Sequence, residues 1–163
     1  MMKYILTALL LVLIAARFLT PEPREYQYLS TVDMDIPAFS VVNVKDGSSF
    51  TDKDLPGNAM ISFISTSCGY CIEQHRLLSN MKEFPVPVYL MFMDQDEDRI
   101  NAMLEKYPGS YYDSALLAGK EFISELEVRG TPMNFIIRNG KIVKIVNGML
   151  NNDAIDTIRK EFK

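Results

Sequence analysis

A nearly uninterrupted apolar segment, Ala59 to Ser65, most constrains what this chain can fold into. A short run without polar alternation is typical of a strand that is covered on both faces of a sheet. A second such run, Val86 to Met93, comes after a segment with apolar residues at helical spacing, which Pro85 and Pro87 end. Two buried strands joined by a helix form a parallel pair, because the helix carries the chain back across the sheet. The sequence therefore predicts an α/β fold with a parallel core.

Two tight turns add antiparallel strands to this core. Asp46-Gly47 and Asn139-Gly140 each favour a two-residue turn between antiparallel strands. The strands that these turns join are predicted at 39–45, 48–51, 133–138 and 141–146. Besides the helix after the first buried strand, which should run to Phe84, helices are predicted at about 98–107, at 115–126 and from Asn152 or Asp153 onward. This order indicates three layers, in which helices flank a mixed central sheet that carries an N-terminal β-hairpin.

The N-terminal segment differs from the rest of the chain. Lys3 precedes an uncharged and mostly apolar stretch, and residues 1–20 are predicted to be a membrane anchor or signal segment. We favour a single uncleaved anchor, because the small residues that a cleavage site needs are missing at Leu13 and Ile14. Residues 21–35, which contain two prolines, are predicted to be a linker to a domain over 36–163. Signal-like segments direct the export of the domain behind them, so this domain is expected to face the periplasm or another extracytoplasmic space, or to be exported if the segment is cleaved.

Composition narrows the possible functions. The net charge is −4 at pH 7, which argues against nucleic acid as the main partner. The two cysteines lie too close together for their bond to stabilise the fold, since a disulfide that closes a very small loop removes little chain entropy. A cysteine pair that contributes little to folding is expected to serve chemistry.

The sequence Cys68-Gly69-Tyr70-Cys71 lies where the first buried strand ends and a helix begins. The unpaired amides and the positive end of a helix dipole favour an anion, so the thiolate of Cys68 should be stabilised there. Cys71 lies one helical turn later, within reach of the Cys68 sulfur. Cys68 could then attack a disulfide, and Cys71 could resolve the mixed disulfide that results.

Other uses of the two cysteines remain open at this stage. A copper site could combine them with His75, which is the only histidine, and a zinc site would need further ligands. An inert pair of core cysteines is a third possibility. His75 itself is expected either to tune the cysteines from the same helix face or to be a partly exposed helix residue.

The cysteine pair, together with Gly130-Thr131-Pro132, resembles the thioredoxin superfamily. Within it, the likeness is to membrane-anchored, extracytoplasmic thiol–disulfide oxidoreductases of the TlpA/ResA type, and it runs from about Ile36 to Lys163. This resemblance implies a thioredoxin-like fold, in which Pro132 is cis and faces the cysteines.

The resemblance also implies the roles of the site residues. Cys68 and Cys71 would be catalytic. The residues that would bind an extended protein substrate are Thr131, Pro132, Gly69 and Tyr70. The substrates would be protein thiols and disulfides. A redox partner protein would donate electrons to the cysteine pair or accept them from it, so no cofactor would be needed. The anchored relatives favour a reductant, with an oxidase or disulfide isomerase as the alternative.

The chain departs from the superfamily pattern at two serines. Ser67 stands where many relatives have a tryptophan before the first cysteine. Ser62 stands where thioredoxin itself has a buried acid, so no acid at this position can assist the deprotonation of Cys71.

Overall fold

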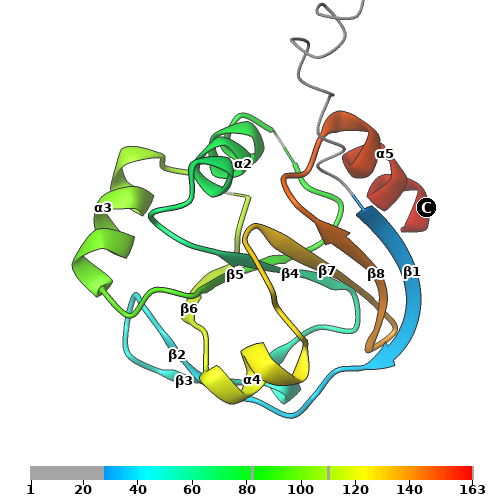
Figure 1. Cartoon of the computed structure of the whole chain (residues 1–163), viewed down its shortest axis with the longest axis horizontal. Coiled ribbons are helices and arrows are strands. Elements are labelled where there is room, and N and C mark those ends of the chain that lie inside the picture. The colour runs from blue at the N-terminus through cyan, green and yellow to red at the C-terminus, as the bar shows by residue number, and fades with distance from the viewer. Residues whose placement is uncertain (1–27, 82, 110, 163) are drawn as a thin grey trace, which may run out of the picture.

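Two fully buried strands lie at the centre of the computed structural model, which describes residues 28–81, 83–109 and 111–162. They belong to an eight-stranded mixed sheet with the order β1-β8-β7-β4-β5-β6-β2-β3 (Figure 1). The strands are β1 (Tyr28–Asp35), β2 (Ser40–Asn43), β3 (Ser49–Thr51), β4 (Ala59–Ile64), β5 (Val88–Phe92), β6 (Ser114–Leu117), β7 (Met133–Arg138) and β8 (Lys141–Asn147). The helices are η1 (Asp52–Asp54), α2 (Gly69–Ser79), α3 (Glu97–Lys106), α4 (Lys120–Glu125) and α5 (Asn152–Glu161).

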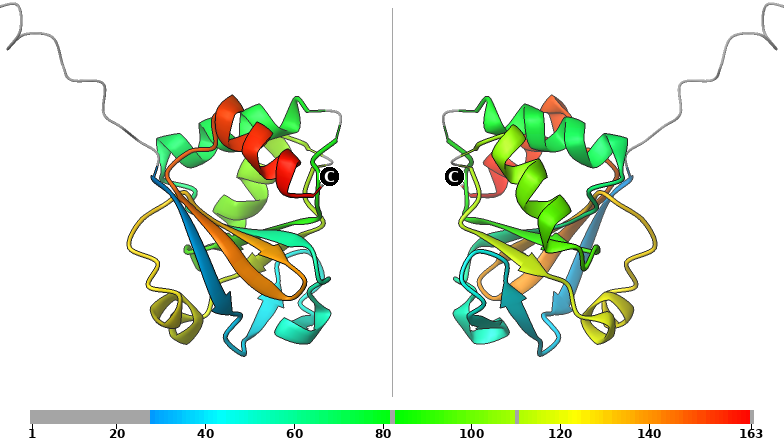
Figure 2. Two further views of the ribbon diagram at one scale, coloured as in Figure 1. Left: turned by 90° about the vertical axis from the view of Figure 1, so that its right-hand side faces the viewer. Right: turned by 90° about the vertical axis from the view of Figure 1, so that its left-hand side faces the viewer.

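Every residue of β4 and β5 is buried, as their apolar sequences predict. The two strands pair in parallel, and β7 runs antiparallel on the other side of β4. Side chains of β4 alternate between two hydrophobic clusters, because successive residues of a strand point to opposite faces. Met60 and Ile64 belong to one cluster and Ile61 and Phe63 to the other. Helices α2, α3 and α5 lie over the first face and α4 over the second (Figure 2), which confirms the three-layer prediction.

The predicted linker over 21–35 is wrong from Tyr28 onward. Strand β1 pairs antiparallel with β8 at the edge of the sheet, with an irregularity between Thr31 and Met34. The prolines lie at the start of the predicted linker, whereas Val32 and Met34 further along pack against the second cluster. The strand forms because β8, more than a hundred residues later, supplies its hydrogen-bond partners.

The helix predicted over 115–126 is also wrong in its first part. Residues 114–117 form β6, which pairs in parallel with β5, and the helix begins only after Gly119. A short apolar run is compatible with either a strand or a helix, and the open edge of β5 decides for the strand. The Ala118 amide continues this pairing by donating to the Phe92 carbonyl at 2.8 Å.

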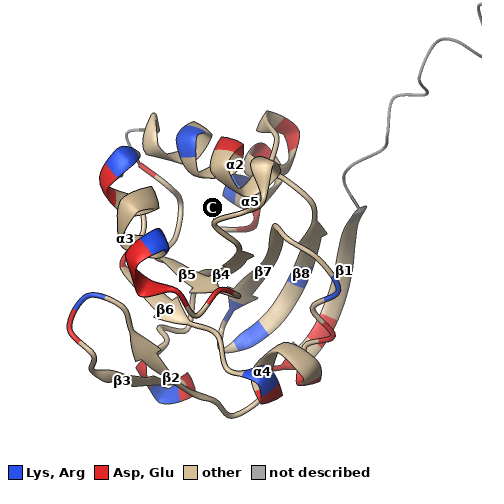
Figure 3. Cartoon of the chain, turned by 60° about the vertical axis from the view of Figure 1, so that its left-hand side comes forward, with Lys and Arg blue, Asp and Glu red and all other residues tan. Residues whose placement is uncertain are grey.

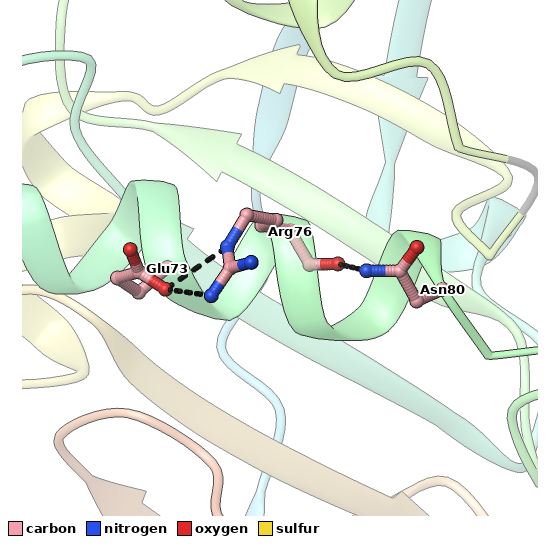
Figure 4. Close-up of polar contacts among 3 residues, drawn as sticks. All are labelled: Glu73, Arg76 and Asn80. Carbon is pink, nitrogen blue, oxygen red and sulfur yellow. Dashed lines mark hydrogen bonds and ion pairs between the residues drawn. The ribbon is translucent and has the colours of Figure 1, made fainter.

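Helix α2 ends at Ser79 and not at Phe84, the end that the spacing of apolar residues predicts. Asn80 closes it, since its side-chain amide donates to the Arg76 carbonyl at 2.9 Å (Figure 4). On the same exposed face, Arg76 forms an ion pair with Glu73 at 2.8 Å. Phe84 is still buried, but it reaches the first cluster from the loop that comes after the helix.

None of the helices in the described residues is long and apolar enough to cross a membrane. The anchor predicted for residues 1–20 lies outside the described part of the chain, as does the linker up to residue 27.

Candidate active site

Cys68 lies in the turn that joins the end of β4 to the start of α2. It is the N-cap residue of α2, and its Sγ accepts a hydrogen bond from the Cys71 amide at 3.2 Å. Cys68 is half-buried, whereas Cys71, one turn into the helix, is 0% exposed. The two residues are free thiols, and only Cys68 is placed to meet a substrate.

The loop before β7 lies against Cys68. Its Thr131–Pro132 peptide bond is cis, as the resemblance implies. The Cys68 thiol donates a hydrogen bond to the Thr131 carbonyl oxygen at 3.3 Å, across a sequence separation of 63 residues. Gly69 and Tyr70, the first residues of α2, are exposed beside the thiol, with 49% of Tyr70 accessible. The fold thus brings together all six residues that the sequence analysis assigns to the site.

Burial controls the acidity of the second cysteine. It raises the pKa of the Cys71 thiol to about 12, and a hydrogen bond with Cys68 acts in the same direction. A hydrogen bond with the Thr131 side chain opposes this shift but does not cancel it. Cys71 is therefore a thiol, not a thiolate, at neutral pH.

The raised pKa of Cys71 predicts how the two cysteines react with an alkylating reagent. At about pH 8 a thiol with a pKa near 12 is ionised in roughly one molecule in ten thousand, and only the thiolate reacts. Iodoacetamide should therefore modify Cys68 first, which peptide mass spectrometry would show. In a Cys68→Ser variant, the alkylation rate of Cys71 should rise about tenfold per pH unit between about pH 8 and pH 11. A rate that reaches its plateau below about pH 10 would contradict the raised pKa.

Asp94 is a site residue that the sequence analysis did not identify. The Thr66 amide donates to its Oδ2 at 2.6 Å, and the Ser65 hydroxyl donates to its Oδ1 at 3.2 Å. Asp94 lies just after β5, which is parallel to β4, so the carboxyl ends of both strands meet at this edge of the sheet. An aspartate directly after a parallel neighbour strand is the signal that could have predicted this contact, which holds the turn that presents Cys68.

The charged groups around this edge are mostly acidic. Asp96 caps α3 by accepting the Arg99 amide at 3.1 Å, and Glu97 and Asp98 occupy the first turn of that helix (Figure 3). Acidic side chains are favoured there because the helix N-terminus carries a partial positive charge.

His75 is buried, so the expectation of a partly exposed helix residue is wrong. It is 1% exposed; its Nδ1 shares a hydrogen bond with the Tyr111 hydroxyl, and its Nε2 lies 2.8 Å from the Tyr107 carbonyl. Burial lowers the pKa of His75, which keeps the ring neutral at neutral pH. Both ring nitrogens of His75 are thus engaged in contacts with tyrosines, and within the described residues no three His, Cys, Asp or Glu side chains are arranged to hold a metal ion.

Comparison with known proteins agrees with this fold. A family model described as a thioredoxin-like domain matches residues 50–163. The thioredoxin domain of a thiol-disulfide oxidoreductase from Bacteroides vulgatus is similar, with a TM-score of 0.67 and 19% identity over 82% of this chain and 100% of that one. A secreted disulfide oxidoreductase from Mycobacterium tuberculosis has a TM-score of 0.63 and 16% identity over 76% of this chain and 95% of that one. A thio-disulfide isomerase from Thermus thermophilus has a TM-score of 0.61 and 21% identity over 78% of this chain and 94% of that one. No curated protein sequence matches the chain.

Proposed function

Since the chain belongs to the thioredoxin-like domain family, we propose that it is a thiol–disulfide oxidoreductase that reacts with protein substrates through Cys68 and Cys71. The observation that supports this most directly is the half-buried Cys68 sulfur, which lies 3.3 Å from the carbonyl oxygen of Thr131 in the cis-proline loop. Cys68 at a helix N-terminus can act as the nucleophile, and the backbone of the half-buried Thr131 can pair with an extended substrate.

The proposed reaction reduces a disulfide in two exchanges. The Cys68 thiolate attacks one sulfur of the substrate disulfide, forms a mixed disulfide and releases the other sulfur as a thiolate, which takes up a proton. The Cys71 sulfur then attacks the Cys68 sulfur, and the second substrate thiol leaves with a proton. Two electrons and two protons have passed to the substrate, and Cys68 and Cys71 end as a disulfide. A redox partner protein would reduce this disulfide again.

We place the reaction outside the cytoplasm, with the chain anchored through residues 1–20. The apolar stretch after Lys3 supports both parts of this proposal. The site itself needs no cofactor, because the cysteines exchange electrons directly with other thiols and disulfides.

The reduction potential of the Cys68–Cys71 couple tests this function and its direction. The full chain would be equilibrated in defined thiol buffers and trapped with a mass-adding alkylating reagent. We expect a reversible two-thiol couple at roughly −250 mV or below, in the range of dedicated reductants such as thioredoxin. A value of about −120 to −180 mV would instead assign an oxidase or isomerase.

A Cys71→Ser variant is the control, because it cannot form the intramolecular disulfide. If the unaltered chain shows no reversible couple either, the oxidoreductase proposal fails and a metal-binding role for the same cysteines becomes the better explanation.

A further inference from the structure

Three buried polar side chains form a network behind the cysteines. They are Ser62 of β4, Gln74 of α2 and Asn134 of β7, and Gln74 is only 2% exposed. Ser62 and Asn134 are cross-strand partners, and the Ser62 hydroxyl donates to Asn134 Oδ1 at 2.7 Å. Gln74 Nε2 donates to both of these oxygen atoms, Ser62 Oγ and Asn134 Oδ1, at 3.0 Å. The network therefore joins the helix of the cysteines to the adjacent strands β4 and β7.

The same side chains also bind the backbone of the segment after β8. The Leu150 amide donates to Gln74 Oε1 at 2.9 Å, and Asn134 Nδ2 donates to the Gly148 carbonyl at 3.1 Å. The Gly148 amide in turn donates to the carbonyl of the cis-proline, Pro132, at 2.9 Å. A continuous set of hydrogen bonds thus leads from the helix that carries Cys71 to the loop that faces Cys68.

Apolar contacts could also hold these elements together, but they depend less on direction than hydrogen bonds do and would fix the relative position of the elements less strictly. Buried polar groups cost free energy unless each finds a partner, but a satisfied network specifies one relative position of its elements. None of the three side chains can ionise, so the network keeps this position at any pH at which the fold is stable. It fills the place where thioredoxin has a buried acid, and it contains no titratable group.

We propose that Gln74 and Asn134 are positioning residues that hold α2 and the cis-proline loop in the relative position in which a protein substrate can engage both. This inference rests on the proposed oxidoreductase function. A protein disulfide must contact Cys68 and the Thr131 backbone together, whereas a small alkylating reagent needs only the thiolate. Loss of the network should therefore slow the reaction with protein disulfides and leave alkylation of Cys68 unchanged.

The test uses Gln74→Glu, which keeps the shape of the side chain and the acceptor for the Leu150 amide. When protonated, the new carboxyl group can still donate one hydrogen bond. When ionised, it loses both donors and faces Asn134 Oδ1 with a negative charge. Burial raises the pKa of such a carboxyl group, so the loss should occur as the pH rises towards neutrality.

The readout is the single-turnover rate at which the pre-reduced full chain reduces insulin, measured from about pH 5 to pH 8. The rate of Gln74→Glu divided by that of the unaltered chain should fall about tenfold over this range, because ionisation removes the one donor that the protonated carboxyl group keeps and places a negative charge against Asn134 Oδ1. The same ratio for iodoacetamide alkylation of Cys68 should stay within about threefold. A purely structural role would change neither ratio in the folded protein.

Two further variants complete the design. Gln95→Glu is the matched control, because Gln95 donates to the Ala118 carbonyl at 3.3 Å outside the network. The insulin-reduction rate of this variant, divided by that of the unaltered chain, should not depend on pH. Ser62→Ala is the milder change if Gln74→Glu fails to fold, and it should slow insulin reduction about threefold at every pH.

The outcomes separate this inference from the proposed function. If the unaltered chain does not reduce insulin, the oxidoreductase proposal itself fails. If the unaltered chain reduces insulin and the network variants lose no activity, or lose alkylation to the same extent, the positioning role is wrong.

Discussion

Replacing Cys68 with serine should lower the rate of protein disulfide reduction by at least about 1000-fold, because a hydroxyl group is not ionised at neutral pH and cannot act as a thiolate does. The fold should survive the change. A serine oxygen can still accept the Cys71 amide and donate to the Thr131 carbonyl, as the sulfur does. We expect the free energy of unfolding to change by less than about 1 kcal/mol. Single-turnover reduction of insulin and urea denaturation measure the two quantities.

Cys71→Ser is the matched variant and should behave differently. Cys68 can still attack, but no second thiol resolves the product, so mixed disulfides with substrate should accumulate. They would appear on non-reducing gels and disappear with dithiothreitol. Activity that survives in Cys68→Ser would show that Cys71 can act as the nucleophile despite its burial. The absence of trapped species in Cys71→Ser would contradict the two-step exchange.

Phe63→Ala should lower the free energy of unfolding by about 3–5 kcal/mol, the usual cost of removing a buried phenylalanine. The side chain of Phe63 is 0% exposed, and its ring centroid lies 5.7 Å from those of Phe122 and Phe135. The change would leave a cavity between β4, β7 and α4 that this packed layer cannot fill. Since a domain of this size is stable by about 5–15 kcal/mol, a large fraction of its stability would be lost.

Leu29→Ala on β1 provides the control. Because Leu29 is 39% exposed, this substitution should lower the free energy of unfolding by less than about 1 kcal/mol. Urea denaturation of both variants measures the difference. The molecules of the Phe63→Ala variant that remain folded should keep their redox chemistry, since the Phe63 ring lies on the side of the sheet opposite α2. A cost below about 1 kcal/mol would show that Phe63 is not part of the packed core.

The central part of the fold could be predicted from the sequence because its signals are local. The apolar runs of β4 and β5 show their burial directly, and Asn139-Gly140 specifies the turn between β7 and β8. The position of Cys68 can be inferred in the same way, since a strand must end and a helix begin around it. Gly130-Thr131-Pro132 pointed to the facing loop only through the resemblance to a known superfamily.

The remaining features depend on partners that are distant in the chain. In the sequence, strand β1 looks like part of a linker until β8 pairs with it, and β6 looks like a helix until the open edge of β5 is taken into account. Asp94 and Gln74 are ordinary polar residues in the sequence. They join the site because parallel strands end side by side and because α2 packs across β4 and β7. The sequence by itself determined the buried strands, the turns and the reactive pair, whereas the tertiary structure decided which polar groups hold that pair in place, since hydrogen bonds between distant segments exist only once the sheet has formed.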